Sequence, residues 1–224
     1  SFAERIKNAS VIFQDGNGEA IGSGFFVDSN VIATAAHVAD ALGENAEIIL
    51  SNGKQSHVRR IAEEDAYDIA LYRAEIRNDP VMLGYFKNVE VGEEVGIIGF
   101  TRGFSDMLVH RGVISSKQET GGIKLLSINA FINKGNSGGA VFSALTGRVI
   151  GIVSARQTDI QSEKFIQLPS NYSSGFAIGG IDPVKFNVDL YNETVKLVGD
   201  VSQVGIGFVS SSDYIYALLQ GIKR

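Results

Sequence analysis

Short runs rich in Val, Ile and Phe recur along this sequence, and residues that favour turns separate them. The runs occupy residues 11–14, 22–27, 31–34, 48–50 and 55–61, and then residues 95–100, 108–115, 124–130, 140–142 and 148–154. Apolar runs of this length, bounded by Gly, Asn and Asp, are typical of strands in a β barrel or sandwich. The pattern therefore predicts an all-β protein.

A stretch without such runs divides the chain into two parts. Residues 77–94, which include Pro80, are interpreted as a crossover between residues 1–76 and residues 95–224. With 224 residues the chain is long enough for a sizeable core, and all-β proteins of this size commonly form one unit. Residues 2–8 predict one or two helical turns before the first strand.

The charged residues exclude some classes of function. The net charge is −5, with 20 basic and 25 acidic residues spread along the chain. A nucleic-acid-binding surface needs clustered Lys and Arg, and the basic cluster at residues 57–60 is better explained as a solvated strand end. No apolar run is long enough to cross a bilayer. We therefore expect neither nucleic acid as a partner nor a membrane span.

The sequence has no cysteine, which excludes disulfides and thiolate metal sites. A chain without disulfides suits a reducing compartment, so we expect the cytoplasm. The periplasm or the outside of the cell stays open if a signal peptide has been removed. Asp15, Asn17 and Glu19 have the spacing of half a calcium loop, but Phe26 stands where a bidentate Glu is needed. We expect no metal and no cofactor.

A serine lies between glycines at residues 135–139, between two apolar runs. Glycine allows unusual backbone angles and the close approach of another main chain, which a catalytic serine needs for binding an oxyanion. The alternative interpretation is a glycine-rich turn with a solvated serine. The pattern also matches the nucleophile elbow of α/β-hydrolases, but there the histidine follows the serine. All three histidines of this chain precede Ser137, so the order His, Asp, Ser remains open.

His37 and Asp68 are the candidates for the other two groups. Small residues around His37 let neighbours come close to its imidazole. Asp68 opens an apolar run, and a buried carboxylate there needs a partner such as an imidazole N–H. His57 lies among polar residues of a predicted strand and is expected to be exposed. No Asp lies between His110 and Ser137, so His110 does not fit this order.

Four motifs, in this order, resemble the trypsin-like serine peptidases and in particular their prokaryotic HtrA/Deg-type branch. They are Gly22-Ser23-Gly24-Phe25, Thr34-Ala35-Ala36-His37, Asp68-Ile69-Ala70-Leu71 and Gly135-Asn136-Ser137-Gly138-Gly139. The resemblance covers about residues 9–156 and resumes at residues 205–208. Four motifs in the right order are far more specific than a single glycine-rich serine motif.

The resemblance implies two six-stranded antiparallel β-barrels of the chymotrypsin type, with the site between them. It also implies a serine endopeptidase that acts on polypeptides. Ser137 would attack the scissile carbonyl, His37 would transfer the proton and Asp68 would orient the imidazole. The N–H groups of Gly135 and Ser137 would form the oxyanion hole.

The sequence departs from the secreted trypsins at positions that matter for activation and specificity. Those enzymes pair a new N-terminus with an Asp directly before the serine, and here Asn136 occupies that position. Phe131 stands at the expected base of the S1 pocket, where trypsin specificity needs an Asp, so we expect an uncharged P1 residue. Ser154, Ala155 and Arg156 resemble the segment that pairs with the substrate main chain, with Arg156 in place of a glycine.

An insertion of about residues 157–204 lengthens the connection between the last two strands. Asp182 and Pro183 predict the N-cap and first residue of a helix, and Gly199 is expected to end it. Apolar residues recur on one face of this helix, at Val184, Val188, Tyr191, Val195 and Val198. We expect this face to pack on the second barrel, on a second subunit of a homo-oligomer, or over the site as a lid.

Residues 212–220 predict a C-terminal helix that Gly221 would end. We therefore expect no PDZ module, which HtrA/Deg proteins usually carry. The complete set of candidate catalytic residues favours an active endopeptidase. The alternative is a catalytically resting or inactive homologue that binds peptides or serves as a scaffold, for which a distorted oxyanion hole would suffice.

Overall fold

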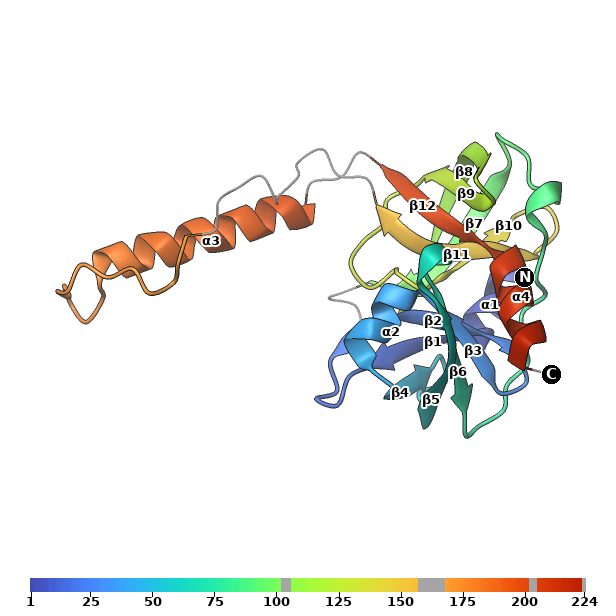
Figure 1. Ribbon diagram of the computed structural model, residues 1–224, viewed down its shortest axis with the longest axis horizontal. Helices are drawn as coiled ribbons and strands as arrows, with labels where there is room; N and C mark the ends of the chain where they lie inside the picture. Colours follow the sequence, from blue (N-terminus) through green and yellow to red (C-terminus); the bar gives the residue numbers. More distant parts are fainter. Residues whose placement is uncertain (102–105, 157–167, 202–204, 223–224) are drawn as a thin grey trace. The chain divides into compact units, whose positions relative to one another are not determined.

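The computed structural model describes residues 1–101, 106–156, 168–201 and 205–222 (Figure 1). Its elements are α1 (Phe2–Ala9), β1 (Ser10–Gln14), β2 (Ala20–Asp28), β3 (Val31–Thr34), α2 (Ala36–Leu42), β4 (Asn45–Leu50), β5 (Gln55–Glu64), η1 (Asp65–Tyr67), β6 (Ile69–Ala74), η2 (Phe86–Asn88), β7 (Glu94–Phe100), β8 (Met107–Thr120), β9 (Ile123–Asn129), β10 (Ala140–Ser143), β11 (Val149–Arg156), α3 (Pro183–Val201), β12 (Ile206–Ser211) and α4 (Ser212–Ile222). Most of these elements are strands, as the apolar runs predicted.

The strands close into two six-stranded antiparallel barrels (Figure 1). The order around the first barrel is β1-β2-β3-β6-β5-β4, and the order around the second is β10-β11-β12-β9-β8-β7. Closure removes the free sheet edges that invite aggregation. The fold class that the resemblance implied is therefore confirmed.

Apolar side chains fill each barrel and the seam between them. Phe13 and Tyr72 lie inside the first barrel with their ring centroids 5.1 Å apart. A further cluster combines Phe25 of β2 with Ile98 of β7 and Phe142 of β10. Burying a side chain of this size stabilises a protein by about 1.5–3 kcal/mol. The shared cluster therefore joins the barrels into one compact unit, residues 1–156 and 205–224.

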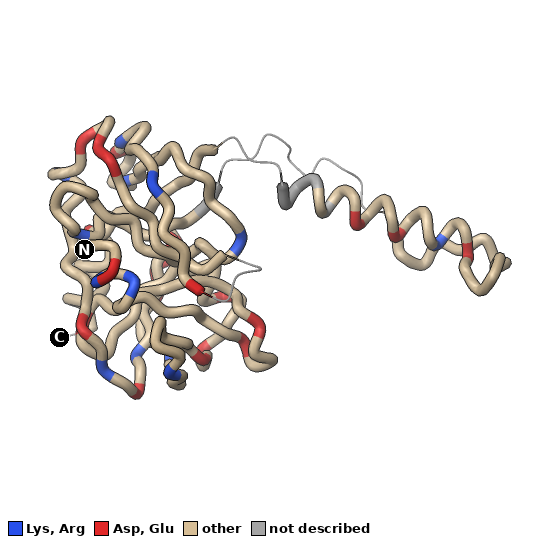
Figure 2. The backbone as a smooth tube through the Cα atoms, turned by 180° about the vertical axis from the view of Figure 1, so that it is seen from behind, with Lys and Arg blue, Asp and Glu red and all other residues tan. Residues whose placement is uncertain are grey.

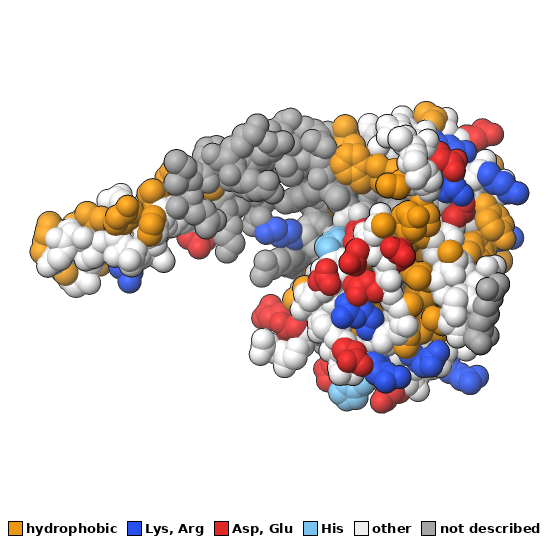
Figure 3. Space-filling model, viewed as in Figure 1, with side chains coloured by type: hydrophobic (Ala, Val, Ile, Leu, Met, Phe, Trp, Pro, Cys, Tyr) orange, Lys and Arg blue, Asp and Glu red, His pale blue; other side chains and the backbone are white. Residues whose placement is uncertain are grey.

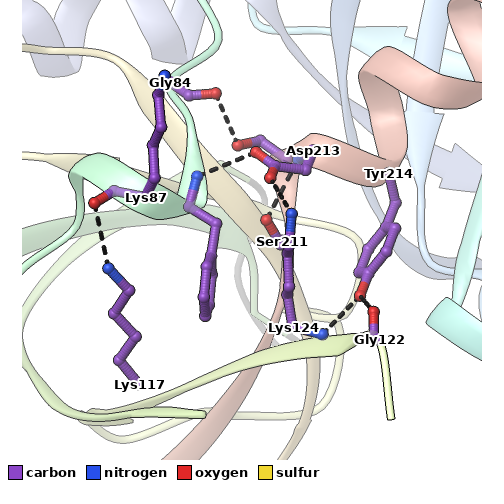
Figure 4. A network of polar contacts seen from close by, with 10 residues as sticks. Gly84, Lys87, Lys117, Gly122, Lys124, Ser211, Asp213 and Tyr214 are labelled. Atoms are coloured by element: carbon purple, nitrogen blue, oxygen red, sulfur yellow. Dashed lines mark hydrogen bonds and ion pairs between the residues drawn. The ribbon is translucent and has the colours of Figure 1, made fainter. Parts of the chain in front are cut away.

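Helix α4 contacts strands of both barrels. Figure 4 shows the polar network at its first turn, where Asp213 accepts a hydrogen bond from the main-chain N–H of Phe86 at 2.9 Å and pairs with Lys124 at 2.8 Å. The hydroxyl of Tyr214 accepts a hydrogen bond from the main-chain N–H of Lys124 and donates one to the carbonyl of Gly122, at 2.5 and 3.1 Å. These contacts connect α4 to the crossover segment and to the β8–β9 hairpin.

The two predicted helix ends lie close to the observed ones, since α3 ends at Val201, two residues after Gly199, and α4 extends to Ile222, one residue after Gly221. A glycine costs a helix interior only about 1 kcal/mol relative to alanine, which the flanking turns can outweigh. The predicted start of α3 agrees with the structure. Asp182 caps it by accepting hydrogen bonds from the N–H groups of Val184 and Lys185 at 2.9 and 3.1 Å.

Residues 157–204 form a second compact unit. Within it, the side-chain amide of Asn192 exchanges two hydrogen bonds with the main chain of Leu168, at 2.9 and 3.0 Å. The predicted apolar face of α3 is divided: Val188 and Val195 are buried, whereas others are exposed, and the side chain of Val198 lies outside the described residues. Apolar side chains are exposed on this unit (Figure 3) at Tyr172, Phe176, Ile178, Ile181, Val184, Phe186, Leu190, Tyr191 and Leu197.

Acidic and basic residues are interspersed over both barrels (Figure 2). Ion pairs account for several of them, such as Lys7 with Asp106 at 2.7 Å and Arg111 with Glu94 at 2.8 Å. In the described ranges, no helix combines the length and the apolar character that crossing a bilayer requires.

Candidate active site

The three residues singled out by the motifs lie on three different elements. His37 lies in the first turn of α2, a helix that the strand pattern did not predict, and buried Ala36, Val38 and Ala39 pack this helix on the first barrel. Asp68 lies between η1 and β6 of the same barrel. Ser137 lies in the loop before β10 of the second barrel. The candidate site is therefore built across the seam.

Asp68 accepts hydrogen bonds from both the main chain and the ring of His37. The main-chain N–H of His37 lies 3.0 Å from Oδ1, and Nδ1 lies 2.9 and 3.0 Å from the two carboxylate oxygens. Because an ionised carboxylate only accepts, Nδ1 carries a proton and Nε2 is the ring nitrogen left to accept one. Asp68 is also the one non-glycine residue with a positive φ in the described ranges, at 53°, a conformation that Asp tolerates better than most residues.

A further hydrogen bond to Asp68 comes from the hydroxyl of Ser154, which lies 2.5 Å from Oδ2. Burial raises the pKa of the Asp68 carboxyl, but the hydrogen bonds from His37 and Ser154 together outweigh it and hold the pKa below its ordinary value of 3.8. Asp68 is therefore ionised at neutral pH. The resemblance placed Ser154 beside the substrate main chain, and it did not anticipate this contact of its side chain.

The loop around Ser137 is fixed by hydrogen bonds of its own main chain and of Asn136. The N–H of Asn136 donates to the carbonyl of Asn133 at 3.0 Å, and its carbonyl accepts from Gly139 at 2.8 Å. Its fully buried side chain donates to the carbonyl of Phe100 at 2.7 Å. The sequence showed only that Asn136 lacks the negative charge of the Asp that secreted trypsins have at this position. In the structure, the side chain of Asn136 attaches the loop to the end of β7 by a hydrogen bond, and this contact needs no charged N-terminus as a partner.

Two main-chain N–H groups of this loop remain available. Throughout the described part of the chain, neither Gly135 nor Ser137 has a hydrogen-bond acceptor for its N–H. Main-chain N–H groups away from bulk water are nearly always paired, so two unpaired ones in a partly buried loop are suited to an anionic oxygen. Gly135 has a φ of 96°, which only glycine adopts readily.

A cavity of about 610 Å³ adjoins this loop. Its size is typical of a ligand-binding cleft. It is lined by Glu19, Ala20, Ile21, His37, Val38, Ala41, Lys134, Gly135 and Ser137. His37 and Ser137 thus face the same space, although the described contacts include no hydrogen bond between the Ser137 hydroxyl and the imidazole. Such bonds are often long in unliganded enzymes and shorten when substrate binds.

Phe131 and Ser154, of the remaining predicted residues whose side chains the structure describes, are not among those that line this cavity. Phe131 is 65% exposed and does not line it, which is not what we expect for the base of a pocket. Ala155 and Arg156 pair through their main chains with Phe208 and Gly207 of β12, and their side chains lie outside the described residues. Over the described ranges, no three His, Asp or Glu side chains are grouped to hold a metal ion.

The other two histidines lie elsewhere on the barrels. His57 of β5 has 72% of its side chain exposed, as predicted, and lies 3.4 Å from Glu47. His110 of β8 is partly buried, and burial lowers its pKa below 6.5. Neither residue lines the cavity that contains Ser137.

Known proteins resemble this chain in sequence and in fold. It is 32% identical over 198 residues to the "Probable periplasmic serine endoprotease DegP-like" of Pseudomonas putida, covering 85% of this chain and 38% of that protein. It is 34% identical over 175 residues to the "Magnetosome formation protease MamE" of Magnetospirillum gryphiswaldense, covering 71% of this chain and 22% of that protein. The chain therefore spans well under half the length of these relatives.

A solved structure titled "HtrA-type protease AlgW with tripeptide" aligns with 99% of this chain and 63% of its own, with a TM-score of 0.70 and 21% identity. That likeness supports the chymotrypsin-like fold. The sequence profile of the trypsin-like peptidase domain matches residues 22–152, more than half of the chain and all four motifs up to β11. The protein thus belongs to the trypsin-like peptidase family, with DegP-like proteases among its relatives.

Proposed function

We propose that this chain is a serine endopeptidase that hydrolyses polypeptides through an acyl-enzyme intermediate. The observation that carries the proposal is the cavity that both Ser137 and His37 line, with the imidazole held by ionised Asp68. A hydroxyl becomes a good nucleophile when an adjacent base removes its proton and a third group orients that base. These three side chains fit those three roles.

In the proposed reaction, the Oγ of Ser137 attacks the carbonyl carbon of the scissile peptide bond while Nε2 of His37 takes its proton. His37 then gives this proton to the leaving amine. A water molecule next attacks the acyl-enzyme while His37 takes its proton, and His37 returns that proton to the Oγ of Ser137 as the product acid leaves. Asp68 keeps the proton on Nδ1 and stabilises the imidazolium that forms. The N–H groups of Gly135 and Ser137 would bind the negative oxygen of the tetrahedral intermediate.

The alternative is a resting or inactive peptide-binding homologue, for which a distorted oxyanion hole would suffice. The unpaired N–H groups of Gly135 and Ser137 favour the active enzyme. We also propose an uncharged P1 residue, because Phe131 stands at the position where trypsin specificity needs an Asp and would offer no carboxylate to Arg or Lys if it formed the base of the S1 pocket. The exposure of Phe131 does not support the narrower prediction that it forms the base of the pocket.

We propose a periplasmic setting for this activity. The DegP-like relatives are named as periplasmic, and they do not support the cytoplasm that the lack of cysteine suggested. A protein without disulfides is compatible with either compartment.

A fluorophosphonate probe tests the proposal, because it forms a covalent bond only with an activated serine. We expect the wild-type chain to be labelled and Ser137→Ala to remain unlabelled, with cleavage of an unfolded polypeptide lost in parallel. Labelling of wild type without cleavage of that polypeptide would mean that Ser137 is activated but that the substrate is unsuitable, whereas absence of labelling would favour the peptide-binding alternative. No labelling of wild type would show that Ser137 is not activated.

A further inference from the structure

We propose that Ser23 is a positioning residue for the oxyanion hole, acting from the opposite barrel; this inference rests on the proposed peptidase function. Ser23 lies in β2 of the first barrel and is fully buried. It belongs to the first of the four sequence motifs, but none of the roles assigned so far involves it. Its hydroxyl and its main-chain N–H contact the loop of Ser137 and the end of β7, whereas its carbonyl accepts a hydrogen bond from the hydroxyl of Thr34 in its own barrel.

The hydroxyl of Ser23 has two partners in the second barrel. It donates a hydrogen bond to the carbonyl of Gly135 at 2.7 Å and accepts one from the N–H of Phe100, the last residue of β7, also at 2.7 Å. Its main-chain N–H donates to the carbonyl of Ser137 at 2.8 Å. A single residue therefore holds the carbonyls on both sides of Asn136.

These two contacts bracket the peptide that carries the Ser137 N–H. In a trans peptide the C=O of one residue points opposite to the N–H of the next. Gly139 holds the carbonyl of Asn136, so the Ser137 N–H must point the other way, while Ser23 fixes the peptides before and after it. The N–H of Ser137 thus lies between two peptides that Ser23 holds, and the other proposed donor, the N–H of Gly135, belongs to the residue whose carbonyl Ser23 holds.

Gly135 needs such an external anchor because of its own backbone freedom. With a φ of 96° and no Cβ, it has little steric resistance to rotation of the neighbouring peptides. A Cβ on Gly135 would lie 2.7 Å from the ring of Phe100, so another residue would not fit there. The hydroxyl of Ser23 supplies the restraint that a side chain on residue 135 cannot.

Two glycines of the sequence allow β2 to approach the loop of Ser137 closely. A Cβ on Gly138 would lie 2.0 Å from the carbonyl oxygen of Ser23, and a Cβ on Gly22 would lie 2.8 Å from Val38 and 3.1 Å from the carbonyl of Ser137. Glycine at both positions therefore lets the two main chains meet. The first and the last motif of the sequence are two sides of one contact across the seam.

The test compares Ser23→Ala with Ser212→Ala, a matched control. Ser212 is also fully buried, and its hydroxyl also donates to a glycine carbonyl, that of Gly84 at 3.0 Å, but in the α4 network. Each change removes one buried hydroxyl and leaves a glycine carbonyl unpaired; Ser23→Ala also leaves the N–H of Phe100 unpaired, so both variants should lose thermal stability and Ser23→Ala should lose more. The Ser23 variant alone should lose activity.

For Ser23→Ala we expect kcat to fall by about 10- to 100-fold with KM within about twofold, since loss of a whole oxyanion donor costs about 10²–10³ in kcat. A peptide aldehyde, whose adduct with Ser137 carries the oxygen that the hole binds, should bind more weakly by a similar factor. The same peptide as an uncleaved ligand, measured with Ser137→Ala in the background, should bind equally with and without the change at Ser23. Ser212→Ala should match wild type in all three measurements.

Equal kcat values for the two variants, or unchanged aldehyde affinity in Ser23→Ala, would overturn the inference. Should Ser23→Ala not fold, Ser23→Cys replaces the hydroxyl with a larger thiol that is a much weaker donor, and it should show the same selective loss of kcat. Wild-type kcat in that variant would equally overturn the inference.

Amide hydrogen exchange of residues 133–139 tests the anchor without turnover, so its result is distinguishable from failure of the proposed function. We expect faster exchange at Asn136 in Ser23→Ala than in Ser212→Ala, because the loop would have lost one restraint. Equal exchange rates would show that the Ser23 hydroxyl does not hold the loop.

Discussion

Asp68 accepts hydrogen bonds from two parts of the same residue, the main-chain N–H of His37 at 3.0 Å and its imidazole Nδ1 at 2.9 Å. One carboxylate therefore fixes both the position of the first turn of α2 and the tautomer of the ring. Ser154 approaches the same carboxylate from the second barrel, at 2.5 Å. The orientation of the proposed base is thus set from both sides of the seam.

Replacing either reacting group should abolish turnover. We expect Ser137→Ala and His37→Ala each to lower kcat by about 10⁶-fold, as in the subtilisin triad. His57→Ala should stay within a few-fold of wild type, because His57 is exposed on β5 and does not line the cavity. Steady-state cleavage of a peptide substrate checks this, and an equally large loss in His57→Ala would show that the base is misassigned.

Asp68→Asn should lower kcat by about 10⁴-fold, because an amide no longer fixes the proton on Nδ1 of His37. The fold should persist, since the side chain keeps its shape. The measurement is kcat at neutral pH together with a circular dichroism spectrum. Activity within tenfold of wild type would mean that His37 does not depend on Asp68 for its tautomer.

Acid should destabilise the protein partly through Asp68. Its folded-state pKa lies below its unfolded value of about 3.8, so the ionised carboxylate contributes stability that is present above about pH 4 and is lost as the pH falls through the folded-state pKa. The difference in unfolding free energy between wild type and Asp68→Asn should therefore shrink between pH 6 and pH 3. Urea unfolding measures it, and Asp65→Asn, at an exposed carboxylate in η1, should follow wild type.

The P1 preference should be uncharged, and Phe131 offers a direct test. If Phe131 forms the base of the S1 pocket, Phe131→Asp should introduce cleavage after Arg or Lys, because a buried cationic P1 residue would gain a counter-charge. Its 65% exposure leads us to expect little change instead. A peptide library profile checks both points, and a wild-type profile dominated by P1 Arg or Lys would contradict the proposed preference.

Replacing residues 158–203 with a short Gly/Ser linker should leave labelling of Ser137 by a fluorophosphonate largely intact, because the candidate site lies within residues 1–156. Cleavage of long or folded substrates should change if the insertion controls access. Size-exclusion chromatography of the same variant tests whether the exposed apolar side chains of this unit join subunits of a homo-oligomer. Equal loss of labelling and cleavage would mean that the barrels need the insertion to fold.

The sequence by itself determined the strands, their order and the candidate triad. The strands could be recognised from local patterns, because runs of β-branched and aromatic residues bounded by turn residues favour a strand. The order of His37, Asp68 and Ser137, together with the four motifs, was sufficient to identify the family. The N-cap at Asp182 was equally local, since its hydrogen bonds reach only two and three residues along the chain.

Only the tertiary structure decided how the site is held. Ser154 reaches Asp68 across 86 residues of sequence, and Ser23 reaches Gly135 across 112. Neither contact has a local pattern, because each depends on how two closed barrels meet. The exposure of Phe131 also depends on how the two barrels pack. The sequence gives the position of a residue along the chain, whereas the packing of the barrels decides whether its side chain faces the cleft.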